Sequence, residues 1–331
     1  MYDPSLDKPG VLTGLGEFLL GVIFFPSIFL MCEMLLRSSK TGREYCEHFK
    51  INSNGIHDIS NKVTSSTFAL FACSIGWIVN QQCTGDIMKE RFYILDNYLI
   101  FGVSYFFYDV ISMYLVYNTL TKETVTVSSS EVIQFLSDRP LIVFHHILVP
   151  LIGFPALMYF RNGYGDCLLG TSFMIEASTP FVSLRVILVH LKMKVSRTLA
   201  VITRFNPAPP FQDSLVYMVN GIMMLLSFFA CRVMLFPILY WWYSSILGLS
   251  LISTIISIPC WCHVATLGLW LPQLFWFNKM LKGSLKVIRG RKTPCEDSPV
   301  PSTIASGVQT GHIAEQTEGS EDDLGTREKL E

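Results

Sequence analysis

The sequence predicts an all-α, polytopic membrane protein, a bundle of about seven transmembrane helices. Half of the 331 residues are hydrophobic and 15% are charged, which is too few charged residues for the surface of a soluble domain of this length. The mean hydropathy is +0.42, and the apolar residues occur in long blocks rather than in short amphipathic stretches. The net charge of −1 gives no basic field that would attract nucleic acid, so we expect no nucleic-acid partner.

Seven apolar blocks are long enough to cross a bilayer, which takes about 20 residues in a helix. The first block is too long for the core of a signal peptide and lacks a small-residue cleavage site, so it is expected to remain as a span. The predicted spans are 11–36, 59–79, 98–117, 141–160, 167–191, 215–236 and 262–281. The stretch that begins at Pro237 is compatible with a further span, a re-entrant segment or an interfacial loop anchored by Trp241 and Trp242.

The distribution of basic residues predicts the orientation of these spans. Lysines and arginines are concentrated in the loops after the first and fifth spans and after the last one, and such loops face the cytosol. Seven crossings satisfy this asymmetry with a lumenal N-terminus, whereas eight would place the most basic segment on the opposite side. The predicted domains are a lumenal N-terminus with the first span (1–36), a membrane domain with six further spans (37–292) and a disordered cytosolic tail (293–331).

The nine cysteines show no disulfide framework in their spacing. Cys32, Cys73, Cys167 and Cys231 lie in or beside apolar blocks, where a free thiol behaves as a small hydrophobe. The Cys-Trp-Cys stretch that begins at Cys260 is too tight for the usual zinc spacing, and no second pair accompanies it. We therefore expect packed thiols and no metal site.

The informative residues are the ionisable side chains inside the apolar blocks, because a charge at membrane depth usually faces the interior of a bundle. They are Asp109, His145, His146, Glu176, Arg185 and Arg232. Polar residues recur around them at helical spacing, which places them on shared helix faces. These faces comprise Tyr105, Asp109 and Ser112 in the third span, Ser172, Glu176, Thr179 and Ser183 in the fifth, and Asn220, Ser227 and Cys231 in the sixth. The pattern predicts a lipid-accessible cavity lined by Asp109, Ser172, Thr179, Ser183 and Asn220.

A buried charge also has a purely structural explanation. Either carboxylate, Asp109 or Glu176, is compatible with an ion pair to Arg185 or Arg232 that neutralises both partners. Glu176 is also compatible with a protonated side chain that donates a hydrogen bond between helices. Pro180 is expected to kink the fifth span one turn later.

The adjacent His145 and His146 point about 100° apart on a helix, so one ring is expected to face the cavity and the other a neighbouring helix. A di-iron site would need several histidine-rich boxes, which seven histidines in the whole chain do not supply. Two interpretations remain open. One imidazole acts in acyl transfer as nucleophile or base, with a carboxylate that fixes its tautomer, or the pair is structural and lines a lipid pocket.

Four motifs together resemble the TLC-domain family, which includes ceramide synthases, the translocon-associated TRAM protein and a set of small TLC-domain-containing proteins. They are FHH in the fourth span, GTSFMIEASTPFVSLR in the fifth, VNGIMMLLSFFACRVMLFPILYWWY in the sixth and LPQLFWF before the basic end. The resemblance extends from the first span to about Arg291 and is strongest to the type-3 branch of the small proteins. It implies a TLC-type helical bundle around a lipid-accepting cavity, in the endoplasmic reticulum membrane or beyond it in the Golgi or plasma membrane.

In the ceramide synthases of this family, a histidine pair and acidic residues move an acyl chain from acyl-CoA to a sphingoid base. The resemblance therefore implies that His145, His146 and Glu176 are catalytic. Two aspartates of the synthase motif correspond here to Leu169 and Ser172, and Asp166 lies one turn upstream. The alternative is a non-enzymatic lipid-binding protein that regulates membrane lipid composition.

The partners that this resemblance implies are membrane lipids, a sphingoid base or ceramide, and fatty acyl-CoA. Acyl-CoA is expected as a co-substrate, and no bound cofactor is expected. The resemblance also allows a homo- or hetero-dimer.

Overall fold

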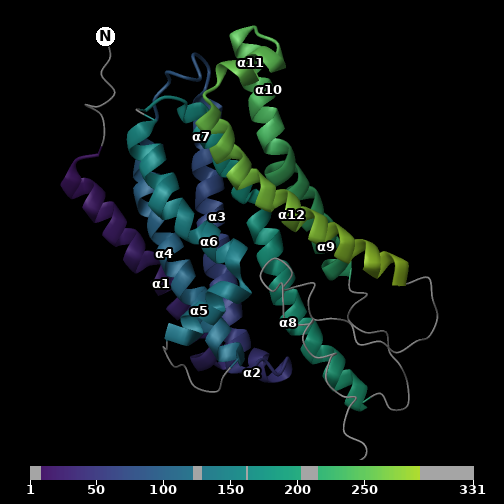
Figure 1. The fold of residues 1–331 in the computed structure, drawn as a ribbon. Helices are drawn as coiled ribbons and strands as arrows, with labels where there is room; N and C mark the ends of the chain where they lie inside the picture. The colour runs from purple at the N-terminus through teal and green to yellow at the C-terminus, as the bar shows by residue number, and fades with distance from the viewer. Residues whose placement is uncertain (1–8, 122–128, 162, 203–214, 291–331) are drawn as a thin grey trace, which may run out of the picture.

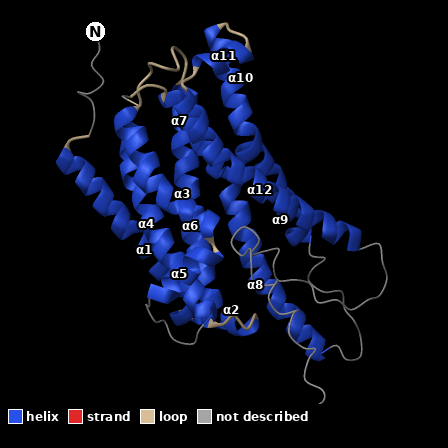
Figure 2. Cartoon of the chain, viewed as in Figure 1, coloured by secondary structure: helices blue, strands red, loops and turns tan. Residues whose placement is uncertain are grey.

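The protein is a bundle of helices in the computed structural model, which describes residues 9–121, 129–161, 163–202 and 215–290. No strand occurs among these residues (Figure 2). The helices are α1 (Val11–Ser38), α2 (Lys40–His48), α3 (Ser53–Gln82), α4 (Tyr93–Thr121), α5 (Ser129–Asp138), α6 (Pro140–Leu148), α7 (Asp166–Phe173), α8 (Thr179–Ile202), α9 (Leu215–Phe228), α10 (Leu235–Leu247), α11 (Leu251–Ser257) and α12 (Cys260–Gly290). The predicted all-α fold is confirmed. The predicted tail lies outside the described residues.

Six segments of the described chain are helical, long and apolar enough to cross a membrane. They are Val11–Ser38, Ser53–Gln82, Tyr93–Asn118, Pro140–Phe160, Asp166–Leu191 and Val216–Leu247. A seventh crossing results if the bent pair Leu251–Ser257 and Cys262–Leu285 forms one span, which gives the predicted count.

The sixth span is longer than predicted, because Pro237 does not end it. The helix continues through this proline to Leu247, so residues 237–247 form the last third of the span rather than a separate segment. A π-helical turn over Phe229–Met234 directly precedes α10. Proline offers no N–H to the preceding turn, and a π turn has a different bonding register, so the helix continues without a break.

Two ends of the bundle are distinguished in Figure 1. The α2 end carries α2 and α5, and the disulfide end carries α11 and the loops that follow α3 and precede α7. In the predicted orientation, the α2 end is cytosolic and the disulfide end is lumenal. The helix α3 is central, since it packs against α1, α4, α7 and α8.

An aromatic cluster joins α1, α3 and α4 in the core. Phe25 is fully buried, and Phe68 stacks on Tyr105 with 4.1 Å between ring centroids. Gly21 lies one turn before Phe25 on the same side of α1, at the closest approach to α4. A methyl group on Gly21 would overlap the carbonyl oxygen of Phe101 and the hydroxyl of Ser104. Because lipid tails are as apolar as these side chains, such close backbone contact is a main source of helix association in a membrane.

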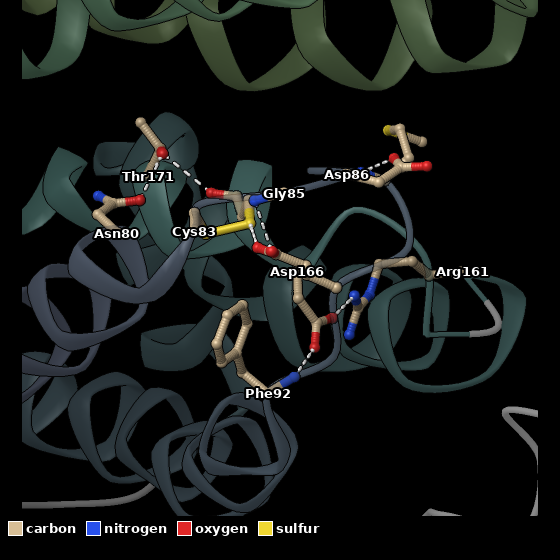
Figure 3. Close-up of a disulfide and its surroundings, with 11 residues drawn as sticks. Asn80, Cys83, Gly85, Asp86, Phe92, Arg161, Asp166 and Thr171 are labelled. Carbon is tan, nitrogen blue, oxygen red and sulfur yellow. Dashed lines mark hydrogen bonds and ion pairs between the residues drawn. A yellow bond between two sulfur atoms is a disulfide. The ribbon is translucent and has the colours of Figure 1, made fainter.

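A disulfide between Cys83 and Cys167 links the end of α3 to the start of α7, with 5.9 Å between the Cα atoms (Figure 3). The prediction of a free, packed thiol at Cys167 is therefore wrong. The two cysteines are 84 residues apart and meet only because α3 and α7 pack side by side, so their spacing along the chain held no signal. Cys32, Cys73 and Cys231 are free thiols, as predicted.

Four charged residues form a buried cluster beside the disulfide. The fully buried carboxylate of Asp166 accepts hydrogen bonds from the Phe92 N–H at 2.6 Å and from Arg161 (Figure 3). It also accepts a hydrogen bond from Arg91 at 2.9 Å. Asp96 pairs with the same two arginines. Burial disfavours the charged guanidinium of Arg91, but its hydrogen bond to Asp96 and the charge of Asp166 outweigh burial and raise its pKa. The loops at the disulfide end are thus held by ion pairs as well as by a covalent bond.

Replacement of Gly21 by leucine should separate α1 from α4 and lower the stability by about 1–3 kcal/mol, the usual cost of overpacking. The measurement is the thermal unfolding midpoint of the purified protein in detergent. Gly16→Leu is the matched control, because a methyl group there meets nothing within 4 Å. Equal midpoints for the two variants would show that the α1–α4 contact does not need a glycine.

The Cys83→Ser substitution should lower stability by about 2–4 kcal/mol, as expected for opening a long cross-linked loop. Without reductant, Cys83 and Cys167 should resist alkylation, and both should react after reduction and unfolding. Cys32→Ser, which removes a free thiol, should leave the unfolding midpoint unchanged. Alkylation of Cys83 in unreduced protein would disprove the cross-link.

Candidate functional site

The ionisable side chains inside the spans form two polar centres. The first joins α4 to α6 around Asp109 and His146, and the second joins the segment between α7 and α8 to the π turn before α10 around Glu176 and Arg232. His145 lies beside the first centre and also approaches α12 through Trp276.

The first centre is a histidine–carboxylate pair. Nδ1 of His146 lies 3.0 Å from Oδ2 of Asp109, and Asp109 is 3% exposed. Asp109 is buried together with Tyr105 and Ser112, so the face predicted for the third span does point into the bundle. The two atoms lie at ion-pair distance, but Nδ1 makes no aligned hydrogen bond in the structure, so the pair is a short electrostatic contact.

The two imidazoles contact different helices, as the geometry of adjacent helical residues requires. The His146 ring lies 5.5 Å from the ring of Phe106 on α4. The His145 ring lies 5.5 Å from the His146 ring and 6.3 Å from Trp276 on α12, nearly perpendicular to both. Both histidines are partly exposed although they lie within a membrane span, so neither is sealed in the core.

The second centre is an ion pair surrounded by hydroxyl and amide groups. Arg232 donates to Oε2 of Glu176 at 3.1 Å, and the hydroxyl of Thr179 donates to the same oxygen at 2.5 Å. The guanidinium also reaches Ser178 at 2.7 Å and Gln273 on α12 at 3.1 Å. The predicted pairing of Glu176 with Arg232 is confirmed. The alternative of a protonated, donating Glu176 stays a prediction.

The backbone between α7 and α8 decides which hydroxyls join this centre. Residues Met174–Ser178 form a 3₁₀ turn, and Pro180 follows it at the second position of α8. Proline cannot donate to the preceding turn, and the tighter winding changes the direction of the side chains. Ser178 therefore reaches Arg232, which uniform α-helical spacing could not predict.

The remaining residues predicted to line the cavity are Ser172, Ser183 and Asn220. The hydroxyl of Ser172 donates to the Leu168 carbonyl of its own helix, and Ser183 is buried. The amide of Asn220 donates to the Phe181 carbonyl at 3.2 Å and so joins α9 to α8. Asn220 therefore contributes to the packing of two helices, whereas the Ser172 hydroxyl is satisfied within its own helix.

Arg185 pairs with neither carboxylate, contrary to one of the predicted alternatives. Its guanidinium lies 3.4 Å from the ring centroid of Tyr217 and donates to the Tyr217 carbonyl at 2.9 Å. This stacking on an aromatic face occupies the arginine at the contact between α8 and α9.

Asp166, which lies one turn upstream of the motif positions, is engaged away from the histidines. Two arginines and a backbone N–H hold its carboxylate at the disulfide end, where α7 begins. The acid that meets His146 is Asp109, from a different span. The spacing of residues in the fifth span gave no indication of this pairing.

Metal-ligating side chains come together at one place in the described chain, where Cys83, Glu90 and Cys167 lie close enough to hold an ion. Both sulfurs are used by the disulfide, so they are not thiolate ligands in this structure. The histidine centre consists of nitrogen and carboxylate groups suited to proton transfer.

Taken together, the spans and the two polar centres define a multi-pass helical membrane protein with an acid–histidine site inside the bundle. The TLC domain matches residues 58–282, which is more than half of the chain, so the protein belongs to the TLC-domain family. No solved structure matches the chain. This domain associates the protein with membrane lipids, and the type-3 branch within the family stays a prediction.

Removal of Arg232 should leave the Glu176 carboxylate inside the bundle without its counter-charge. We expect Arg232→Met to lower the stability by about 3–5 kcal/mol, and the double variant with Glu176→Gln to recover most of that loss. Thermal unfolding in detergent measures both effects. Arg185→Met is the matched control, because that arginine has no carboxylate partner among the described residues. Equal losses for the two arginines, or no recovery in the double variant, would contradict the ion pair.

Proposed function

We propose that this protein transfers an acyl chain from acyl-CoA to the amino group of a sphingoid base, in ceramide and sphingolipid metabolism. The observation that carries the proposal is the contact of 3.0 Å between His146 and Asp109, with His145 beside it. Histidine needs a carboxylate to hold its tautomer and to stabilise the charged ring in the reaction. Asp109 is in a position to do this although Leu169 and Ser172 occupy the places of the motif aspartates.

The two histidines take different roles in this mechanism. A nitrogen of His145 attacks the thioester carbonyl, an N–C bond forms, and the C–S bond breaks as the CoA thiolate leaves. The amine of the sphingoid base then attacks the acyl-imidazole, and the bond to His145 breaks as the amide forms. His146 accepts the amine proton on Nε2, and Asp109 stabilises the resulting imidazolium.

Glu176 has a supporting role in the proposed site rather than that of the orienting acid. Its carboxylate is held by Arg232 and Thr179, and Gln273 completes the group from α12. Because α12 also supplies Trp276 beside His145, this second centre fixes the wall that the reacting histidine faces.

A second candidate function is non-enzymatic lipid binding that regulates membrane lipid composition. The observation that favours it is the engagement of Glu176 by Arg232, which takes the acid of the synthase motif out of proton transfer. The same polar centres would then hold the head of an amphiphile without covalent chemistry. Native mass spectrometry separates the two candidates, because an acyl adduct on a histidine supports the enzyme and exchangeable lipid alone supports the binder.

The endoplasmic reticulum membrane is the proposed location, with the disulfide end in the lumen. The Cys83–Cys167 bond supports this orientation, because disulfides persist on the oxidising side of that membrane. The basic loops at the α2 end would then face the cytosol, where acyl-CoA is available. Transport to the Golgi or plasma membrane, and a homo- or hetero-dimer, are compatible with this orientation.

The Asp109→Asn variant should lower the rate of acyl transfer by about 10²- to 10⁴-fold, the range for loss of acid–base assistance. His145→Ala and His146→Ala should each lower it at least as far. The assay supplies acyl-CoA and a sphingoid base to the purified protein and quantifies the N-acylated product.

The matched control is Glu33→Gln, which removes another carboxylate–histidine contact, at 3.3 Å to His57, away from the site. Its activity should equal that of the wild type. Turnover that survives both histidine substitutions would remove the catalytic proposal and leave the lipid-binding function.

A further inference from the structure

Three metal-ligating side chains meet at the disulfide end, outside the proposed catalytic site. Cys83 lies directly after α3, Cys167 in the first turn of α7, and Glu90 in the loop that precedes α4. Their sulfur and carboxylate oxygen atoms all lie within 4.8 Å of one another. In the oxidised protein the two sulfurs are joined as a disulfide, so the set can receive a metal ion only after reduction.

The distance between Glu90 and Cys167 already suits two ligands of one zinc ion. Oε2 of Glu90 lies 3.5 Å from Sγ of Cys167, and an oxidised sulfur carries no proton that it could donate to this oxygen. Zinc binds sulfur at about 2.3 Å and carboxylate oxygen at about 2.0–2.2 Å in a tetrahedron, which places these two ligand atoms about 3.5–3.7 Å apart. Two sulfurs on one zinc ion lie about 3.8 Å apart, and reduction frees Cys83 to take that position.

Contacts that do not depend on the disulfide hold two of the ligands in place. The second oxygen of Glu90, Oε1, accepts a hydrogen bond from the Gly85 N–H at 2.7 Å, which fixes the carboxylate with Oε2 beside the sulfur. Arg91 and Asp166 form an ion pair at 2.9 Å inside the buried charged cluster. Because Glu90 precedes Arg91 and Cys167 follows Asp166 in the chain, this pair keeps both ligands together when the S–S bond opens.

The three ligands are accessible from the loop side of the bundle. Cys83 and Glu90 are partly exposed, whereas Cys167 is fully buried. A reductant and a metal ion can therefore enter from the surface, and water can supply the fourth ligand of a zinc site with three protein ligands. Two thiolates and one carboxylate favour zinc over calcium or magnesium, which take oxygen ligands.

We propose that the reduced protein binds one zinc ion through Cys83, Cys167 and Glu90, in place of the disulfide. A dithiol supplies the two electrons and two protons that convert the S–S bond into two thiols, and is itself oxidised to a disulfide. The zinc ion then displaces both thiol protons, which pass to water, and two Zn–S bonds connect α3 to α7 again. The same residues thus link these helices covalently when oxidised and through a metal ion when reduced.

The test compares zinc binding by the oxidised and the reduced full-length protein in detergent. Reduction uses a phosphine, which becomes a phosphine oxide with an oxygen atom from water and is removed under anaerobic conditions before zinc is added. Zinc is titrated against a chromogenic chelator, and alkylation of Cys83 and Cys167 with and without zinc is followed by mass spectrometry. The reduced wild type should bind one equivalent of zinc more than the oxidised protein, and zinc should protect both thiols from alkylation.

Glu90→Gln should weaken zinc binding by at least tenfold, because it removes a ligand, and should leave the disulfide of the oxidised protein intact. Asp86→Asn is the matched control, because Asp86 lies in the same loop but pairs with Lys89 at 2.9 Å, and its zinc affinity should equal that of the wild type. Cys83→Ser should abolish the additional equivalent. Cys262→Ser, which removes a free thiol in the first turn of α12, should retain it.

Three results would each overturn the zinc site. They are equal zinc binding by the reduced and oxidised proteins, equal affinity of Glu90→Gln and Asp86→Asn for zinc, and alkylation of both thiols at the same rate with and without zinc. A reduced protein that unfolds and binds no zinc has the same consequence. The proposed acyl transfer and lipid binding stand in all these cases, because the three ligands lie outside the histidine centre.

Discussion

A charge inside a membrane protein must find its partner within the bundle, and this constraint organises the structure. At the disulfide end, two arginines and two aspartates neutralise one another. Deeper in the bundle, Glu176 meets Arg232 and Asp109 meets His146. Most of these contacts join different helices, so the pairing of charges also determines which helices lie together. Close backbone contacts such as that at Gly21 then complete the packing.

The proposed site has an acid next to a histidine although the aspartates of the synthase motif are absent. The motif aspartates are replaced by Leu169 and Ser172, but a carboxylate reaches His146 from α4 instead of from the fifth span. What the chemistry requires is an oxygen atom at hydrogen-bonding distance from a ring nitrogen, whichever helix carries it. The residues at the motif positions therefore do not by themselves decide whether a carboxylate lies next to His146. Here the geometry retains an acid–histidine pair that the motif alone does not show.

Departures from regular α-helix occur in the spans that contain prolines. Two π-helical turns follow α6 around Pro150 and Pro155, a third precedes Pro237, and a 3₁₀ turn precedes Pro180. Each adjusts the winding where a backbone N–H is missing, and each rotates the side chains that follow. The 3₁₀ turn brings Glu176, Ser178 and Thr179 to one arginine. The local backbone thus shapes the second polar centre.

The sequence by itself determined the helical class, five of the spans to within about six residues and several of the buried charges, because these depend on local hydropathy and spacing. It also offered the pairing of Glu176 with Arg232 as one of several alternatives, since few opposite charges lie at membrane depth, but it did not choose among them. Only the tertiary structure decided that Cys83 bonds to Cys167, that Asp109 contacts His146 and that Arg185 stacks on Tyr217. These contacts join residues that are distant in the chain. They depend on which helices become neighbours and how each is rotated, and neither quantity is encoded in the local pattern.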